Sequence, residues 1–499
     1  MKAGDKNRPS TLGDLKKSGY RSRSVKDEIR SNLINGIRAG KPVFEGVLGY
    51  EHSVFPEVER ALLSRHNINL LGLRGQAKTR MARQLIKLLD PAIPIVAGSP
   101  INDDPLQPIS RYSLDLIEEE GDATPIEWIG PEQRYTEKLA TPDVSVADLI
   151  GDTDPIKAAR LKLDYSDERV IHFGLVPRAN RGIFVINELP DLQARIQVAL
   201  FNILQEGDIQ IRGFKLRLPL DVLFVFTANP EDYTSRGAII TPLKDRIQSQ
   251  ILTHYPRSKE ISGAITRQEA RLTPEQEQSI EIPELMADLV EEIAIAARNS
   301  EFVDQKSGVS ARLTISAFEN LVSSVERRML YSGEEKARAR VGDLLSLVPA
   351  ITGKVELVYE GEQEGPRNVA LGLIGKALRS TFSQYFPDPE LVKKRKNEAN
   401  PYEQIIDWFS KRSLELDNQL SEAELRKKLL SVSGLQKLVQ KYNPGIAERD
   451  ESLMMEFVLH GLAEHSLIGK GLLEEGLSFR DLFSSVFSMD DFEDEDMNE

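Results

Sequence analysis

The segment INLLGLRGQAKT, residues 68–79, constrains the fold of this 499-residue chain more than any other stretch. Residues 68–71 are a short, mostly apolar run that predicts a strand, and a helical pattern with Met81, Leu85 and Leu89 on one face follows the segment. A strand, a tight loop with glycines and a helix in this order direct successive backbone N–H groups and the positive end of a helix dipole at one point. The segment therefore predicts an α/β fold with an anion site at the end of a strand.

The loop suits a phosphate group in particular. Six residues would supply its backbone cradle: Gly72, Leu73, Arg74, Gly75, Gln76 and Ala77. Lys78 would reach the β- and γ-phosphates of a nucleotide, and Thr79 would give its hydroxyl to a magnesium ion. Ala77 stands where a last glycine is usual, a departure of one methyl group. The loop thus predicts ATP and Mg²⁺ as cofactors, and a glycine-bearing turn at a helix start is the plainer alternative.

Four more apolar runs follow along the chain: PIVAG at 94–98, IFVI at 183–186, VLFVF at 222–226 and ILTHY at 251–255. They are continuous rather than alternating, which is typical of strands buried on both faces of a parallel sheet. Helical patterns separate them, so the α/β prediction extends over this whole region. Residues 208–218 predict a hairpin with Gly213 at the turn. Residues 100–165 look like a long irregular insertion, which at that length needs a function or hidden structure.

Polar residues follow the IFVI run at 183–186 directly. Glu188 is a candidate for the base that polarises an attacking water molecule, and Asn187 precedes it where a carboxylate is common. The amide oxygen of Asn187 could hold Mg²⁺ through a bound water, but it lacks the charge that makes such hydrogen bonds roughly twice as strong. Weaker magnesium retention is therefore expected. Taken alone, the segment would be an ordinary buried strand followed by a polar turn.

Three further residues are candidates by their positions. Asn229 follows the VLFVF strand, where it could touch the γ-phosphate or orient the water, although taken alone an Asn-Pro turn is the better explanation. Arg246 could stabilise transition-state charge, including from a neighbouring subunit, and a surface salt bridge is the alternative. Arg312 begins a helical pattern and could sense nucleotide from the same subunit.

Composition excludes several classes of protein. The chain has no cysteine, so disulfides and thiolate metal sites are excluded, and a reducing, cytoplasmic location is expected. Its six histidines show no zinc-ligand spacing. A net charge of −14 argues against a nucleic-acid-coating surface. No apolar run is long enough to span a bilayer, and the polar N-terminal residues lack the apolar stretch of a secretory signal.

Taken in order, these segments resemble the AAA+ ATPases, and in particular the branch that holds the magnesium chelatase ATPase subunit, subunit I, and the MoxR proteins. Beyond the loop, the resemblance rests on FEGVLGYE from residue 44, VAGSPINDDPLQP from 96, DLIGDTDPIKA from 148, GLVPRANRGIFVINEL from 174, LQEGDIQIRG from 204 and TANPED from 227. It covers roughly residues 40–345. It implies a P-loop core with a parallel sheet, followed by a helical lid.

The sequence pattern and the resemblance together divide the chain into five parts. The predicted parts are a basic N-terminal arm (1–40), an AAA+ α/β nucleotide-binding domain (41–258), a helical lid (259–345), a mostly helical C-terminal domain (346–489) and an acidic disordered tail (490–499). It implies a homo-oligomeric ring, usually of six subunits with sites at their interfaces, and a partner with a von Willebrand A domain. By position, Glu188 carries over as base, Asn229 as first sensor, Arg246 as finger acting on the next subunit, and Arg312 as second sensor.

The expected function is ATP hydrolysis that remodels or matures a partner protein complex. The asparagine at position 187 keeps open a slow or non-hydrolysing nucleotide-dependent scaffold, and the family keeps open a true metal-chelatase motor subunit. An activator of the bacterial enhancer type, also an AAA+ protein, would need a loop resembling Gly-Ala-Phe-Thr-Gly-Ala, and the sequence contains none.

Overall fold

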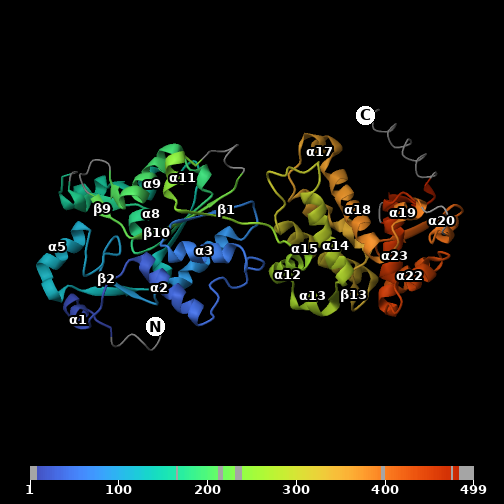
Figure 1. The fold of residues 1–499 in the computed structure, drawn as a ribbon, viewed down its shortest axis with the longest axis horizontal. Helices are drawn as coiled ribbons and strands as arrows, with labels where there is room; N and C mark the ends of the chain where they lie inside the picture. Colours follow the sequence, from blue (N-terminus) through green and yellow to red (C-terminus); the bar gives the residue numbers. More distant parts are fainter. Residues whose placement is uncertain are drawn as a thin grey trace. The chain divides into compact units, whose positions relative to one another are not determined.

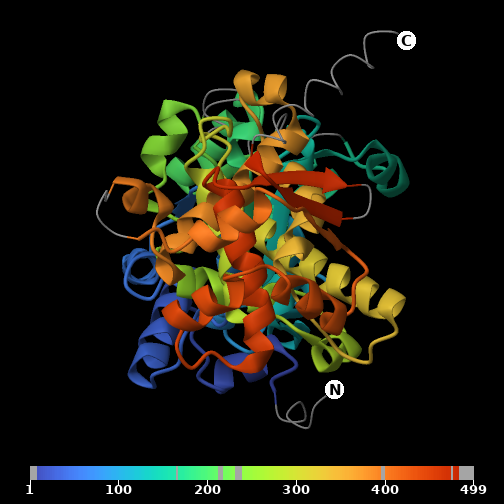
Figure 2. The same cartoon turned by 90° about the vertical axis from the view of Figure 1, so that its right-hand side faces the viewer.

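The computed structural model describes residues 8–164, 167–211, 217–230, 239–394, 399–473 and 476–482. The chain forms two compact units, Met1–Tyr255 and Pro256–Glu499 (Figures 1 and 2). The predicted acidic tail at 490–499 and the predicted hairpin turn at Gly213 lie outside the described residues.

A five-stranded parallel sheet forms the centre of the first unit. Its strand order is β11-β1-β10-β7-β4. The bounds are β1 Ile68–Leu71, β4 Tyr135–Leu139, β7 Gly182–Asn187, β10 Val222–Ala228 and β11 Ser249–Leu252. Every neighbouring pair is parallel. The structure thus confirms the predicted parallel α/β core, with β1, β7, β10 and β11 arising from four of the predicted apolar runs.

The predicted strand PIVAG, at 94–98, lies outside the parallel sheet. Residues Ile93–Val96 form β2, which pairs antiparallel with β3 (Ile126–Ile129) in a separate two-stranded sheet. The prediction that PIVAG belongs to the parallel sheet was therefore wrong. Pro94 has no N–H to donate to a ladder, which suits β2 to a short, separate pairing. The edge strand of the main sheet is instead β4, YTEKL, whose polar residues suit a half-exposed edge.

The region 100–165 is structured rather than irregular. It contributes β3, β4, α5 (Arg111–Glu120), α6 (Val146–Leu149), β5 (Gly151–Thr153) and α7 (Pro155–Leu161), with short 3₁₀ turns at Gly121–Ala123 (η3) and Pro131–Arg134 (η4). Its apolar residues are sparse because these elements are short and several face solvent. The absence of long apolar runs therefore made it look like a loop.

Helices cover both faces of the parallel sheet (Figure 1). Along β7, Phe184 and Ile186 belong to one apolar cluster with the residues of α9 and α11, whereas Ile183 and Val185 belong to another with those of α2, α3 and α4. The remaining elements of this unit, in chain order, are α1 Leu12–Lys17, α2 Val25–Arg38, α3 Val54–Leu63, α4 Lys78–Gln84, η2 Leu85–Leu88, η5 Glu168–Val170, β6 Ile171–Phe173, α8 Leu175–Arg178, η6 Leu189–Asp191, α9 Ala194–Glu206, β8 Asp208–Gln210, β9 Arg217–Pro219 and α11 Thr241–Arg246. Strands β8 and β9 pair antiparallel, which confirms the predicted hairpin arms.

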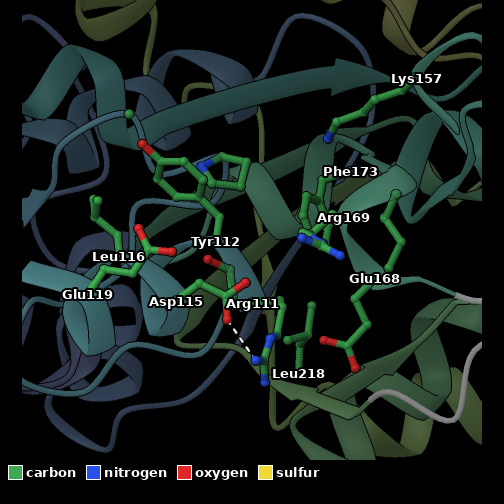
Figure 3. A pocket seen from close by; sticks show the side chains of 14 residues that line it. Arg111, Tyr112, Asp115, Leu116, Glu119, Lys157, Glu168, Arg169, Phe173 and Leu218 are labelled. Atoms are coloured by element: carbon green, nitrogen blue, oxygen red, sulfur yellow. Dashed lines mark ion pairs between the residues drawn. The ribbon is translucent and has the colours of Figure 1, made fainter. Parts of the chain in front are cut away.

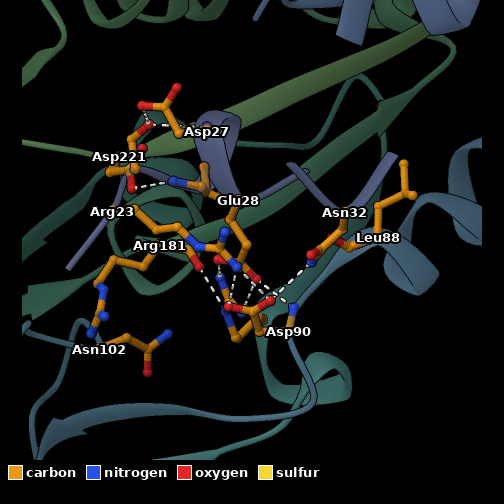
Figure 4. A network of polar contacts seen from close by, with 12 residues as sticks. Arg23, Asp27, Glu28, Asn32, Leu88, Asp90, Asn102, Arg181 and Asp221 are labelled. Atoms are coloured by element: carbon orange, nitrogen blue, oxygen red, sulfur yellow. Dashed lines mark hydrogen bonds and ion pairs between the residues drawn. The ribbon is translucent and has the colours of Figure 1, made fainter. Parts of the chain in front are cut away.

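The N-terminal residues are built into this unit. Ser24 caps α2 by accepting a hydrogen bond from the Asp27 amide. From α2, Glu28 forms a buried ion pair with Arg134 at 2.7 Å. Asp90 donates its backbone N–H to the same carboxylate at 2.5 Å, and Asp221 accepts the Val25 N–H at 2.7 Å (Figure 4). Helix α2 is thus fixed to the turns that precede β2, β4 and β10.

The second unit is mostly helical. Its helices are α12 Lys259–Glu269, α13 Pro274–Ser279, α14 Glu284–Arg298, α15 Arg312–Ser332, η7 Val341–Leu347, α16 Val348–Thr352, α17 Tyr359–Glu364, α18 Pro366–Tyr385, α19 Pro389–Lys394, α20 Glu403–Phe409, α21 Glu422–Leu430, α22 Leu435–Tyr442 and α23 Glu448–Glu464. Its strands are β12 Ile280–Glu281, β13 Ala337–Arg338, β14 Leu414–Asp417, β15 Gly469–Leu473 and β16 Gly476–Arg480. One apolar core runs through it from Leu285 to Phe479. The antiparallel sheet β14-β16-β15 is drawn in red and orange in Figure 2.

Candidate functional site

The loop between β1 and α4 is held tightly against the end of the sheet. Gly75 and Ala77 adopt left-handed backbone conformations, with φ of 72° and 56°. A Cβ on Gly72 would lie 1.9 Å from the Thr253 hydroxyl oxygen and 2.2 Å from Gln76 Oε1. Those two groups bond to each other at 2.6 Å, with the hydroxyl donating. The space at Gly72 and the turn at Gly75 therefore require glycine, whereas Ala77 adopts its conformation at a cost of about 1–2 kcal/mol.

Two tyrosines anchor the backbone of this loop. The Tyr50 hydroxyl lies 3.0 Å from the Gln76 carbonyl oxygen and 2.8 Å from that of His254. The Tyr255 hydroxyl donates to the carbonyl of Arg74 at 3.2 Å. Burial raises the pKa of Tyr50 to about 12, so its hydroxyl stays a donor at physiological pH. Tyr50 belongs to the FEGVLGYE segment, whose contribution to the site no sequence argument identified.

Lys78 begins α4 and points back across the loop. Its amine donates to the carbonyls of Gly72 and Leu73, the latter at 2.9 Å, and to Asn229 Oδ1 at 2.7 Å. Only 7% of Lys78 and 6% of Asn229 are exposed. Asn229 lies directly after β10, so this contact joins the loop to the end of a neighbouring strand.

The amide of Asn187 lies beside Thr79 at the end of β7. Its Oδ1 accepts hydrogen bonds from the hydroxyls of Thr79 at 3.3 Å and Thr227 at 3.1 Å. Its Nδ2 donates to Glu137 Oε1 at 2.7 Å. A carboxylate only accepts, so Glu137 fixes which end of the amide faces Thr79.

Glu137, on β4, was not predicted as a site residue. Arg83 of α4 binds its carboxylate through two hydrogen bonds, at 2.8 and 2.9 Å. The Arg83 guanidinium holds the pKa of Glu137 below its usual value, so the carboxyl is ionised. A negative charge therefore lies directly behind the neutral amide of Asn187.

Glu188 adopts a left-handed conformation, φ 55°, that is uncommon for a residue with a Cβ. Its amide donates to the Thr227 hydroxyl at 3.2 Å, and its Oε2 accepts from Asn229 Nδ2 at 2.8 Å. Asn229 thus bridges Lys78 and Glu188, with each end of its amide assigned by its partner. Strained residues of this kind cluster at functional sites, where the surrounding structure enforces them.

The two predicted arginines belong to different units. Arg246 ends α11, where its guanidinium lies over the Phe201 ring at 5.0 Å and contacts Asp245 and Gln205. Arg312 is the first residue of α15 in the second unit and is exposed. Within the first unit, the structure therefore brings together Lys78, Thr79, Asn187, Glu188 and Asn229, and Arg246 has its contacts elsewhere.

The residues present fit a magnesium nucleotide. The loop offers backbone N–H groups at a helix N-terminus for phosphate oxygens. Thr79 and Asn187 offer the hard oxygen atoms that Mg²⁺ prefers. Within the described part of the chain, no cluster of three or more His, Cys, Asp or Glu residues could hold a metal on its own. Thr79 and Asn187 are therefore the residues that would hold a phosphate-bound Mg²⁺, Asn187 through a bound water.

A second concavity, of about 480 Å³, lies between α5 and the segment that holds α7, η5 and β6. Figure 3 shows Tyr112 and Leu116 of α5 on one side, and Lys157, Arg169 and Phe173 on the other. Its lining carries charges of both signs around apolar side chains. None of its lining residues belongs to the loop at 72–79, so it is separate from the phosphate cradle.

Comparison with known proteins gives three findings. A family profile described as the Sigma-54 interaction domain matches residues 164–251, the part that includes β7, α9 and β10. The chain is 26% identical over 212 residues to magnesium-chelatase subunit ChlI-1 of Arabidopsis thaliana, covering 41% of this chain and 46% of that protein. It is 28% identical over 207 residues to the magnesium-chelatase 38 kDa subunit of Cereibacter sphaeroides, covering 40% and 55%.

The chain thus spans about half the length of the curated relatives it matches. Among solved structures, a model of the complex between subunits BchI and BchD of magnesium chelatase is similar at 19% identity. That likeness covers 64% of this chain and 98% of the other, with a TM-score of 0.33, too low to carry an argument. Along the described part of the chain, no helix is both long and apolar enough to cross a bilayer.

Proposed function

We propose that this chain, which belongs to the AAA+ ATPases in the branch of magnesium chelatase subunit I, binds ATP with Mg²⁺ and hydrolyses it to remodel or mature a partner protein complex. The observation that carries the proposal is the convergence of Lys78, Thr79, Asn187, Glu188 and Asn229 where β1, β7 and β10 end. In open parallel sheets, ligands bind at the carboxyl ends of the strands.

Each of these side chains has a task in phosphoryl transfer. Mg²⁺, bound with the nucleotide, neutralises charge on the phosphates. Lys78 holds the β- and γ-phosphates, and Thr79 and Asn187 hold the ion, the amide acting through a bound water. Glu188 polarises the attacking water, and Asn229 keeps that carboxylate in place through the 2.8 Å bond from Nδ2. Asn229 also contacts Lys78, so it links the group that holds the phosphates to the base.

Two arginines complete the proposed machinery, one acting on a neighbouring subunit and one within its own subunit. Arg246 is one-third exposed on α11 and contacts Gln205 and Phe201 rather than the loop, which suits a finger directed at a neighbouring site. We propose a homo-oligomeric ring of six subunits, in which Arg246 of one subunit reaches the γ-phosphate held by the next. Arg312 of the second unit would sense the nucleotide within its own subunit. A protein with a von Willebrand A domain is the proposed partner, in the cytoplasm.

Binding is tested with a fluorescent ATP analogue. Lys78→Ala removes the ammonium that bridges the loop and Asn229, so binding or turnover should be lost. Far-ultraviolet circular dichroism and the melting temperature provide the control that this variant is folded. Undiminished binding and turnover in folded Lys78→Ala protein would refute the assigned site.

The trans arrangement is tested by mixing two inactive variants. Glu188→Gln lacks the base but keeps its finger, and Arg246→Ala lacks the finger but keeps its base. Each alone should bind ATP without releasing phosphate. Mixed rings contain interfaces where an intact finger faces an intact base, so phosphate release should return. Full activity of Arg246→Ala alone would exclude the trans model.

Two alternatives remain to be separated by measurement. A nucleotide-dependent scaffold would bind ATP but release phosphate no faster than Glu188→Gln. A metal-chelatase motor is favoured by the magnesium-chelatase relatives, and it would require ATP-dependent insertion of Mg²⁺ into a porphyrin with partner subunits present. An enhancer-type activator is favoured by the Sigma-54 interaction domain profile that matches residues 164–251, but the sequence has no loop resembling Gly-Ala-Phe-Thr-Gly-Ala.

A further inference from the structure

The carboxylate of Glu137 lies beside the magnesium-side amide without being able to serve as a ligand itself. Four hydrogen bonds reach its two oxygens: two from Arg83, at 2.8 and 2.9 Å, one from the Tyr135 hydroxyl at 3.2 Å, and one from Asn187 Nδ2 at 2.7 Å. A carboxylate offers about four acceptor positions, and all of them are used here. The contact of Glu137 with the magnesium side of the site is therefore its hydrogen bond with Asn187.

The geometry sets the direction in which this hydrogen bond acts on a bound ion. Because Asn187 Nδ2 donates to a charged acceptor, this hydrogen bond is of the stronger, charge-assisted kind. It keeps Oδ1 pointing at the Thr79 hydroxyl, 3.3 Å away, and polarises the amide so that Oδ1 gains negative charge. Outer partners that orient a metal ligand in this way are worth about 10–100-fold in metal affinity.

We infer that Glu137 is a positioning residue for magnesium, and that Glu137 and Asn187 together replace the single carboxylate usual at the end of this strand. Glu137 supplies the charge, and Asn187 presents the oxygen. The inference rests on the proposed function, since it concerns the ion held at the same site. Arg83 belongs to α4, the helix that begins with the loop lysine, so the pair also connects the edge strand to the phosphate loop.

The arrangement makes a counterintuitive prediction for Asn187→Asp. A carboxylate at position 187 would meet Glu137 where a 2.7 Å hydrogen bond now lies, and neighbouring like charges disfavour each other's ionised forms. Restoring the usual aspartate should therefore weaken magnesium binding instead of improving it. Changing Glu137 to glutamine at the same time exchanges the two groups, so that an amide N–H again donates to a carboxylate.

The test measures how much Mg²⁺ is needed to support binding of a fluorescent ATP analogue. Glu137→Gln and Asn187→Asp should each raise the half-saturating Mg²⁺ concentration about tenfold. The exchanged double variant, Asn187→Asp with Glu137→Gln, should lie within about threefold of the wild type. Binding of the analogue in EDTA should be unchanged in all three, which a merely structural defect would not allow.

A matched control exists in the second unit. Gln276 Nε2 donates to Glu326 Oε2 at 2.7 Å, the same amide–carboxylate contact far along the chain. Glu326→Gln makes the same chemical change there and should leave the Mg²⁺ requirement unaltered. The inference is overturned if Asn187→Asp alone lowers the Mg²⁺ requirement, or if the double variant is no better than the single ones.

The outcomes also separate this inference from the proposed function. A wild-type chain that binds no ATP analogue at any Mg²⁺ concentration would refute the proposed function. Wild-type binding that depends on Mg²⁺, with an unchanged requirement in Glu137→Gln, would refute only the role of Glu137.

Discussion

The buried ion pair between Glu28 and Arg134 provides a quantitative test of how the N-terminal segment is attached. The two side chains are 3% and 1% exposed and share two hydrogen bonds of 2.7 Å. Arg134 also donates to the Arg181 carbonyl at 2.8 Å, and Glu28 accepts the Asp90 N–H. Arg134→Met would leave Glu28 buried with that single N–H donor.

The expected cost follows from this isolation. Removing one partner of a buried pair leaves an uncompensated charge and typically costs about 3–5 kcal/mol, a large part of the roughly 5–15 kcal/mol that stabilises a domain. Replacing both charges, as in Glu28→Leu with Arg134→Met, also removes the desolvation of both ions. The double variant still loses the bonds to Asp90 and Arg181, about 1 kcal/mol each. It should therefore lie within about 2 kcal/mol of the wild type and above the single variant.

The assay is urea unfolding followed by tryptophan fluorescence. The chain has two tryptophans, Trp128 in the first unit and Trp408 in the second, so a Trp408→Phe background reports the first unit alone. Trp128 suits this purpose because its Nε1 donates to the Pro9 carbonyl at 2.9 Å, within the N-terminal segment. The free energy of unfolding is compared between the wild type and the variants, provided that its dependence on urea concentration, the m-value, is unchanged.

A small effect would refute the reasoning. If Arg134→Met costs less than about 1 kcal/mol, the pair is hydrated in solution and does not hold α2 in place. If the double variant is as unstable as the single one, the loss comes from packing instead of charge. The same reasoning predicts that a chain lacking residues 1–40 loses the folded first unit, since it removes both α2 and Glu28.

Further predictions address the loop and the second unit. Gly72→Ala should destabilise the first unit by about 1–3 kcal/mol and weaken ATP-analogue binding, because the added methyl would collide with Thr253 and Gln76. Adding Thr253→Ala to this variant should recover part of the lost stability, measured as melting temperature. Ala77→Gly should raise the melting temperature, since glycine adopts φ 56° without strain, and an unchanged value would contradict the left-handed assignment. Burial raises the pKa of Glu456 to about 7, so the folded second unit holds this proton more tightly than the unfolded chain. The contribution of Glu456 to stability should therefore fall as pH rises from 4.5 to 7, whereas that of the adjacent His460, whose pKa burial lowers, should rise. The difference between wild type and Glu456→Gln in Trp408-monitored unfolding isolates the contribution of Glu456.

The sequence predicts the strands that hold the site because those strands are buried on both faces. The runs at β1, β7 and β10 are continuous and apolar, and a parallel central strand leaves few other uses for such a run. The same reasoning fails for β2, which is equally apolar but pairs only with β3. It also misses β4, because an edge strand that is half exposed has no need of apolar residues.

In the candidate site, too, single segments predict some features, and contacts between distant segments determine the others. Lys78, Thr79, Asn187, Glu188 and Asn229 are visible in the sequence because each follows a recognisable strand. The order of the strands in the sheet determines which of these residues are in contact. That order depends on the connections between the strands, and no single segment predicts it.

Glu137 is a contact of Asn187 that the sequence alone does not predict. In the sequence, Asn187 stands where a carboxylate is usual, and its neutral amide predicts weaker magnesium binding. In the structure, β4 and β7 run parallel with Leu139 opposite Asn187, and this register brings the Glu137 carboxylate to the amide. A shift of one residue would turn Glu137 to the other face of the sheet. The charge is thus displaced by one hydrogen bond instead of lost, and an aspartate at position 187 would carry one charge too many for this site.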